Sequence, residues 1–133
     1  MSQILADLKN AATWTVLQQA GNTNANGSVL DLATYRGPVR FVCAVSQITS
    51  GLGAAHLNAA YVQHSTDNST FTNVTNGAFT AVVNAANASN CGIQTLTFTG
   101  RALNRYVRVP IEVSGTNTNV PVNISVIAQK QYT

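Results

Sequence analysis

Two stretches near the C-terminus alternate between apolar and polar residues, and this period of two constrains the fold more than any other feature. Successive side chains on a β-strand point to opposite faces, so the pattern predicts strands that are buried on one side. Residues 105–113 and 120–128 are therefore predicted to be half-buried strands. Their buried faces would carry Val107, Val109, Ile111 and Val113 in the first, and Val120, Val122, Ile124, Val126 and Ala128 in the second. In the second stretch, Pro121, Asn123, Ser125 and Ile127 would point outward.

Further apolar runs divide the rest of the chain into short strands. Residues 39–48 are apolar on both faces, which is typical of a central strand or of one whose outer face meets a partner. Proline cannot donate to a β-ladder, so Pro110 and Pro121 indicate edge positions, bulges or strand starts. Many short strands with turn-forming residues between them predict an all-β sandwich or barrel. The other predicted strands are residues 13–19, 29–35, 59–65, 71–75, 79–84 and 94–99, with breaks at 21–28, 49–53, 85–92 and 114–119.

The N-terminal segment differs from the rest of the chain. Ile4, Leu5 and Leu8 lie at helical spacing behind a possible cap at Ser2, which predicts a short helix or an extended arm. A chain of 133 residues suits one domain. We therefore expect an N-terminal arm at residues 1–12 and a single β-sandwich domain at 13–133. Apolar arm residues that have no place in the sandwich core would be buried on a neighbouring molecule.

Composition indicates a neutral, hydrogen-bonding surface. Only 8% of the residues are charged, and the net charge of +3 arises because acids are scarce. A surface with few charges favours contact with neighbouring molecules. Nucleic-acid binders need a stripe of Lys and Arg, but only Arg101, Arg105 and Arg108 are close together, so no nucleic-acid partner is expected. The four carboxylates are Asp7, Asp31, Asp67 and Glu112.

The N-terminus also bears on where the protein is made. Asp7 and Lys9 interrupt the apolar run that a secretory signal would need, so synthesis in the cytoplasm is expected. No stretch approaches the roughly 18 consecutive apolar residues of a membrane span, so no membrane partner is expected.

Residues with catalytic potential are few. His64 and Ser65 are neighbours that point to opposite faces of a strand, so they cannot form a triad with Asp67. We expect His56 in a polar loop, His64 in a strand, and neither as a metal ligand. Two cysteines without clustered spacing do not indicate a zinc site, so both are expected as free thiols, Cys43 in the core and Cys91 in a turn. The sequence therefore predicts no enzyme, no cofactor and no metal.

Three features could serve binding instead. Asp67 and Asn68 lie between strand patterns and tolerate left-handed conformations, which indicates a tight hairpin, and a plain turn is its simplest role. Arg108 should point outward, available for a partner's carboxylate or else solvated at a strand end. The arm is the third feature, and we expect it to act as a clamp. The candidate protein-interface residues are Ile4, Leu5, Leu8, Lys9, Arg101, Arg105 and Arg108.

Three segments stand out as motifs: residues 5–11 (LADLKNA), 62–74 (VQHSTDNSTFTNV) and 105–109 (RYVRV). With them the chain resembles a family of small phage proteins encoded among head genes, the capsid decoration or cement proteins. Family hairpins often have Gly where this chain has Asn68, and residues 49–58 look individual. The resemblance implies an antiparallel, jelly-roll-like β-sandwich on the outside of an icosahedral shell. There it would tie together subunits of the major capsid protein.

The resemblance also sets expectations for assembly and location. Symmetric shells present three-fold and two-fold sites, so we expect a homotrimer first and a dimer second, on the capsid surface of the virion. One alternative is a carbohydrate-binding fibre or tail component that adsorbs to host surface glycans, although the aromatic residues are scattered. The other is a shell-forming subunit, for which 133 residues is short. The aromatics in question are Trp14, Tyr35, Tyr61, Tyr106 and Tyr132.

Overall fold

The structure is a computed structural model, and it describes residues 13–21, 24–47, 55–83, 85, 88–99, 102–115 and 120–130. These residues form antiparallel strands and one short 3-10 helix, η1 (Ala88–Asn90). No helix in this part of the chain is long and apolar enough to cross a membrane. The strands are β1 (Thr13–Gly21), β2 (Leu30–Asp31), β3 (Tyr35–Val45), β4 (Ala55–Ser65), β5 (Thr72–Ala78), β6 (Gly92–Phe98), β7 (Tyr106–Arg108), β8 (Ile111–Gly115) and β9 (Val120–Lys130).

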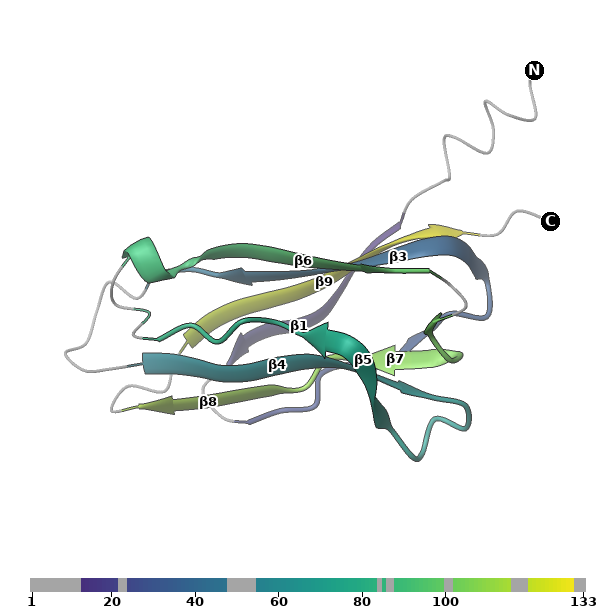
Figure 1. Ribbon diagram of the computed structural model, residues 1–133, viewed down its shortest axis with the longest axis horizontal. Coiled ribbons are helices and arrows are strands. Elements are labelled where there is room, and N and C mark those ends of the chain that lie inside the picture. The colour runs from purple at the N-terminus through teal and green to yellow at the C-terminus, as the bar shows by residue number, and fades with distance from the viewer. Residues whose placement is uncertain are drawn as a thin grey trace, which may run out of the picture.

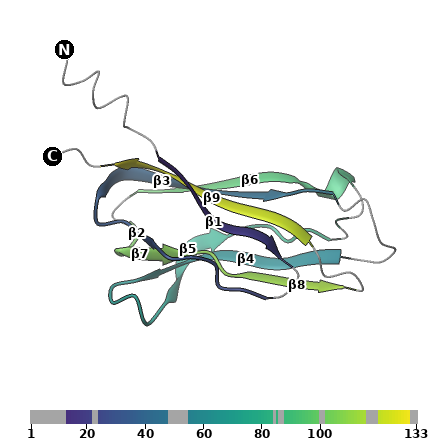
Figure 2. The same ribbon diagram turned by 180° about the vertical axis from the view of Figure 1, so that it is seen from behind.

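The strands form two layered sheets (Figures 1 and 2). One sheet has the order β1-β9-β3-β6, and the other has the order β2-β7-β4-β5, with β8 also paired to β4. β7 and β8 pair with consecutive parts of β4, so they act as two halves of one strand. The first strand then lies beside the last, the second beside the second-to-last, and β3 beside β6. This nesting of strand pairs is the topology of a jelly roll, and it confirms the predicted antiparallel sandwich.

The core lies between the sheets and follows the period of two. Every apolar residue that was predicted to face inward from residues 105–113 and 120–128 is buried. In β3, Val39, Phe41, Cys43 and Val45 are buried as well. β3 lies between β9 and β6, so the prediction of a central strand is confirmed. Side-chain alternation therefore locates the core of both sheets.

Ser125 was predicted to point outward from its strand, and it is nevertheless buried. Its side chain is 1% exposed, although it lies on the outer face of β9. β9 is a central strand, and Val42 of β3 stands directly opposite Ser125. A small side chain between larger neighbours is covered by them, and the Ser125 hydroxyl donates to Asn123 Oδ1 at 2.7 Å.

Predicted strand 29–35 is mostly wrong. Only Leu30 and Asp31 form β2, because the chain then turns and the Tyr35 N–H donates to the Leu32 carbonyl at 3.0 Å. The Asp31 carboxylate stabilises this turn by accepting from the Ala33 N–H at 2.9 Å. β3 consequently begins at Tyr35 and ends at Val45, earlier than the predicted range of 39–48.

The described residues 79–83 of the predicted strand 79–84 do not form a strand. Val82 forms an isolated bridge with Leu57. The backbone groups of Thr80 bond to a side chain and not to a neighbouring strand. The Gln94 amide accepts from the Thr80 N–H at 2.7 Å and donates to the Thr80 carbonyl at 2.8 Å. His56 was predicted in a loop and lies within β4, which begins four residues before the predicted strand.

Candidate interaction surface

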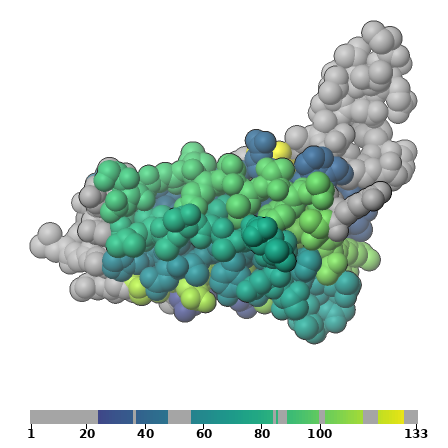
Figure 3. All heavy atoms as spheres, in the orientation of Figure 1, coloured from purple at the N-terminus to yellow at the C-terminus, as the bar shows by residue number. Residues whose placement is uncertain are grey.

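One end of the sandwich, at the right of Figure 1, gathers several connections, and we call it the β7 end. The β4–β5 loop, the turn between β2 and β3, and the segment that leads into β7 meet there. The pairs Asp31 with Tyr106 and Ser65 with Tyr106 bring these elements together. β1 begins at this end, where Thr13 pairs with Ala128 near the end of β9. Figure 3 shows the β4–β5 loop projecting beyond the body of the molecule.

Arg105 is held at the β7 end by a bidentate ion pair. Its Nε and Nη2 donate to Asp31 Oδ1 and Oδ2, both at 2.9 Å. Its guanidinium carbon lies 5.0 Å from the centre of the Tyr106 ring, a cation–π arrangement. The hydrogen bond from Arg105 lowers the pKa of Asp31 below its usual value. The Arg105 side chain remains 54% exposed, so a positioned guanidinium is presented to solvent.

Arg108 points outward from β7, as expected, but other side chains already hold it. Its Nε donates to Gln63 Oε1 at 2.9 Å, and its guanidinium carbon lies 4.1 Å from the centre of the Phe71 ring. Gln63 in turn donates to Asn73 Oδ1 at 2.9 Å. Arg108 is half-buried, and its availability to a partner's carboxylate stays a prediction. The contacts join β7, β4 and β5 into one ordered outer face.

A shallow depression of about 240 Å³ opens beside Arg105. Leu32, Tyr35 and Leu103 supply apolar side chains to it, and Asn104 and Arg105 supply polar ones. Sequence reasoning missed this depression, because its lining comes from β3 and from two connections that are far apart in the sequence. The only sequence signal was that apolar Leu32 and Leu103 fall next to turns. Such a depression can receive one apolar side chain of a partner.

The predicted hairpin at the tip of this end is confirmed, with a longer loop than a tight turn. Residues 66–71 connect β4 to β5, and Asn68 adopts the left-handed conformation with φ of 58°. The Asp67 carboxylate organises the loop through Oδ1, which accepts from the N–H groups of Ser69 and Thr70, both at 2.9 Å. The Ser65 hydroxyl donates to the same oxygen at 2.8 Å. These hydrogen bonds lower the pKa of Asp67 to about 2.

The remaining residues with catalytic potential take structural positions. His64 Nδ1 accepts from the Asn104 N–H at 3.2 Å, which ties β4 to the segment before β7. No disulfide joins Cys43 and Cys91, and burial raises the pKa of the Cys43 thiol to about 12. The Cys91 thiol donates to the Ala85 carbonyl at 3.4 Å. Within the described ranges, no three His, Cys, Asp or Glu side chains gather as a metal site would require.

Five of the seven candidate interface residues cannot be placed. Ile4, Leu5, Leu8, Lys9 and Arg101 lie outside the described residues. The structure places the other two, Arg105 and Arg108, near one another on β7 and the bend before it. The chain enters β1 at the same end of the sandwich. The roles of the arm and of the arginines in an interface stay predictions.

No protein-family model matches this chain, and no curated protein does. Among solved structures, the chain is similar to the one described as "Crystal structure of SPBc2 prophage-derived protein YomS". The identity is 13% and the TM-score is 0.53, and the match covers 90% of this chain and 93% of the other. At this level of identity the likeness is one of fold, and it agrees with the β-sandwich described above.

Proposed function

We propose that the protein is a non-enzymatic structural component of a phage virion that binds the outside of the icosahedral capsid. It bridges subunits of the major capsid protein and so stabilises the shell. The observation that carries this proposal is the β7 end, where an apolar depression lies beside a positioned arginine. The fold likeness to a prophage-derived protein supports a phage origin.

The side chains at the β7 end suit a protein interface. Arginine and aromatic residues contribute most of the binding free energy at interfaces. Arg105 against Tyr106 and Arg108 against Phe71 supply both residue types. Because Asp31 and Gln63 already hold the two guanidinium groups, their ordering costs little further side-chain entropy on binding. The depression offers a pocket for an apolar anchor from the partner.

The mechanism is the addition of interface area across subunit boundaries. Each copy contacts two or more capsid subunits, so expansion or rupture of the shell must also break those contacts. A ligand that binds only the assembled lattice stabilises it by mass action. The protein is made in the host cytoplasm and ends on the capsid surface. Because closed symmetry reuses one interface, we propose a homotrimer, with a dimer second. Sedimentation velocity distinguishes the two.

The first test is co-sedimentation of the purified protein with expanded, undecorated capsids of the phage that encodes it. We expect saturable binding at a fixed ratio per capsid subunit, and no binding to unassembled major capsid protein. Arg105→Ala should weaken binding by about tenfold or more, as loss of a central interface arginine does. Arg40→Ala is the matched control, because Arg40 lies on β3 in the other sheet and should leave binding unchanged. Absence of binding to shells contradicts the proposal.

A further inference from the structure

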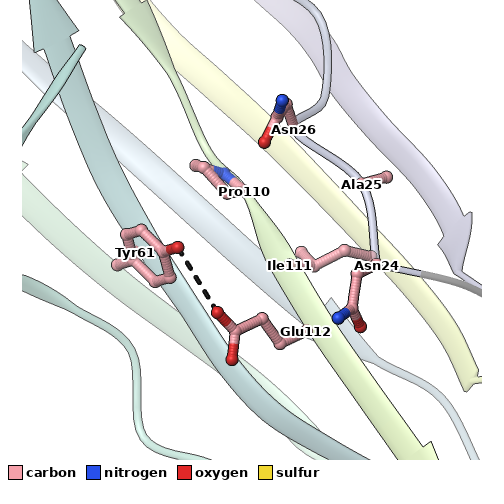
Figure 4. A pocket seen from close by; sticks show the side chains of 7 residues that line it. All are labelled: Asn24, Ala25, Asn26, Tyr61, Pro110, Ile111 and Glu112. Carbon is pink, nitrogen blue, oxygen red and sulfur yellow. Dashed lines mark hydrogen bonds between the residues drawn. The ribbon is translucent and has the colours of Figure 1, made fainter.

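A second depression, of about 190 Å³, lies away from the β7 end among β4, β8 and residues 24–26 (Figure 4). Tyr61 stands on one side of it, and Asn24 and Asn26 stand on the other. Pro110 and Glu112 lie between these two walls. None of its lining residues also lines the depression beside Arg105. The two depressions can therefore be changed by separate substitutions.

The walls of this depression are held in place by the backbone. The Ala25 N–H donates to the Ile111 carbonyl at 3.1 Å, and the Ile111 N–H donates back to the Ala25 carbonyl at 2.8 Å. Asn24 Oδ1 accepts from the Val113 N–H at 2.9 Å. On the opposite wall, the Tyr61 N–H donates to the carbonyl of Pro110, which lies between the two walls, at 3.3 Å. The backbone of both walls and the side chain of Asn24 are thus positioned before any ligand arrives.

The polar groups suit a ligand that carries several hydroxyls. The Tyr61 hydroxyl faces Glu112 Oε1 at 3.5 Å, a long and weak hydrogen bond that leaves most of the acceptor capacity of the carboxylate unused. The Asn24 amide nitrogen has donors that face away from its bond to Val113. Asn26 is exposed and supplies a donor and an acceptor together. A half-buried Tyr61 ring adds an apolar surface against which C–H groups can pack.

The charge of the depression determines which hydroxylated ligands fit. Glu112 is its carboxylate, and no described residue that lines it is cationic. An acidic sugar or a phosphate would meet an uncompensated negative charge there. A neutral sugar could donate its hydroxyls to Glu112, accept from the asparagine amides, and lay one face on Tyr61.

We propose that this depression is a binding site for a neutral saccharide, formed by Tyr61, Glu112, Asn24 and Asn26. A shallow site of this size binds weakly by itself. Many copies arrayed on one particle convert weak binding into strong adhesion, because each further contact forms at a high effective concentration. The site would therefore add adhesion to glycans to the capsid-binding role.

The test is saturation-transfer-difference NMR with maltotriose, cellotriose, mannotriose and chitotriose, and with 3′-sialyllactose as an anionic comparison. We expect at least one neutral trisaccharide to bind saturably, and more tightly than 3′-sialyllactose. Glu112→Gln should weaken that binding by about tenfold, because the amide removes one acceptor and the negative charge. Tyr61→Phe retains the ring and should give a smaller loss. Asp31→Asn, which changes an exposed carboxylate at the β7 end, should leave saccharide binding unchanged.

Three outcomes overturn this inference. In the first, no neutral trisaccharide binds saturably. In the second, wild type and Glu112→Gln bind the trisaccharide equally well. In the third, the protein binds 3′-sialyllactose more tightly than any neutral trisaccharide. Thermal melts of both variants confirm that they remain folded. Capsid co-sedimentation of Glu112→Gln separates the two proposals, because this variant should bind shells as the wild type does. A negative saccharide assay therefore leaves the capsid-binding proposal to be tested separately, and a negative capsid assay leaves the saccharide proposal to be tested separately.

Discussion

Asp67 organises the β4–β5 loop with one exposed carboxylate, so its contribution to stability should depend on pH. Its pKa is lowered to about 2, chiefly by the hydrogen bonds from Thr70, Ser65 and Ser69. A lowered pKa in the folded state stabilises the protein above the ordinary pKa of 3.8, and that stabilisation is lost as the pH falls through about 2. Asp67→Ala should therefore melt below wild type at pH 7, and the difference should narrow toward pH 2. Thermal midpoints across this range provide the measurement, and a constant difference would contradict the assignment.

Cys43 and Cys91 should differ in reactivity toward a thiol reagent. Cys43 is fully buried between the sheets, and its pKa of about 12 keeps the thiol protonated at neutral pH. The thiolate is the nucleophile, so Cys43 should not react in the folded protein. Cys91 is only half-buried and should react first. Titration with Ellman's reagent should give one reactive thiol in the native state and two in denaturant. Two fast-reacting native thiols would contradict the burial of Cys43.

At the scale of the element, β5 is shaped by a bulge of several residues. Its register jumps from Asn73 opposite Gln63 to Ala78 opposite Tyr61, so residues 74–77 face Val62 alone. Asn76 provides the bend with a left-handed φ of 59°. Gly77 is buried in the bulge, and a Cβ there would lie 2.9 Å from the Val74 carbonyl oxygen and 3.3 Å from Val62 Cβ. A single methyl group is too large for this position.

Gly77→Ala should accordingly lower the free energy of unfolding by about 1–3 kcal/mol, the usual cost of overpacking. Urea denaturation provides the measurement. Thr75→Ala is the control, because Thr75 is exposed in the same strand and its loss should change stability little. If Gly77→Ala is as stable as wild type, the close approach between β5 and β4 is not present in solution.

At the scale of the whole molecule, the arm and the β7 end are expected to act together on the shell. The described part of the chain begins with β1 at the β7 end, where Thr13 pairs with Ala128. Deletion of residues 1–10 should leave the sandwich folded and weaken capsid binding by about tenfold or more, since two linked contacts bind more tightly than one. Co-sedimentation with expanded capsids provides the measurement. A truncated protein that folds and binds at full strength shows that the arm is not the clamp.

Binding of many copies should also change the thermal stability of the whole particle. Shells saturated with the protein should release DNA at a higher temperature than undecorated shells, because rupture must also break the added contacts. Release of DNA followed by dye fluorescence during heating tests this expectation. Arg40→Ala should protect as well as wild type, whereas Arg105→Ala should protect less at equal concentration. Identical release temperatures with and without bound protein would leave no stabilising role.

Much of the fold could be predicted because period-two alternation depends only on the chemistry of neighbouring residues. The buried faces of residues 105–113 and 120–128 followed directly from it, as did the central position of β3. The hairpin at Asp67 and Asn68 followed from residues that favour left-handed turns. The candidate sites were less predictable. Arg105 and Arg108 could be singled out by charge, but Asp31 and Gln63 are far away in the sequence and could not be foreseen as their partners.

The sequence by itself determined the inward faces of residues 105–113 and 120–128 and that the core is formed by short β-strands, because strand periodicity and turn chemistry are local properties. Tertiary structure decided what depends on contacts between distant segments. The Gln94 side chain forms hydrogen bonds with the N–H and the carbonyl of Thr80, so these groups do not join a β-ladder where a strand was predicted. Side chains of neighbouring strands cover Ser125. Tyr61 meets Glu112 only because β8 pairs beside β4. Both depressions arise in the same way, from connections and strands that the jelly-roll topology brings together.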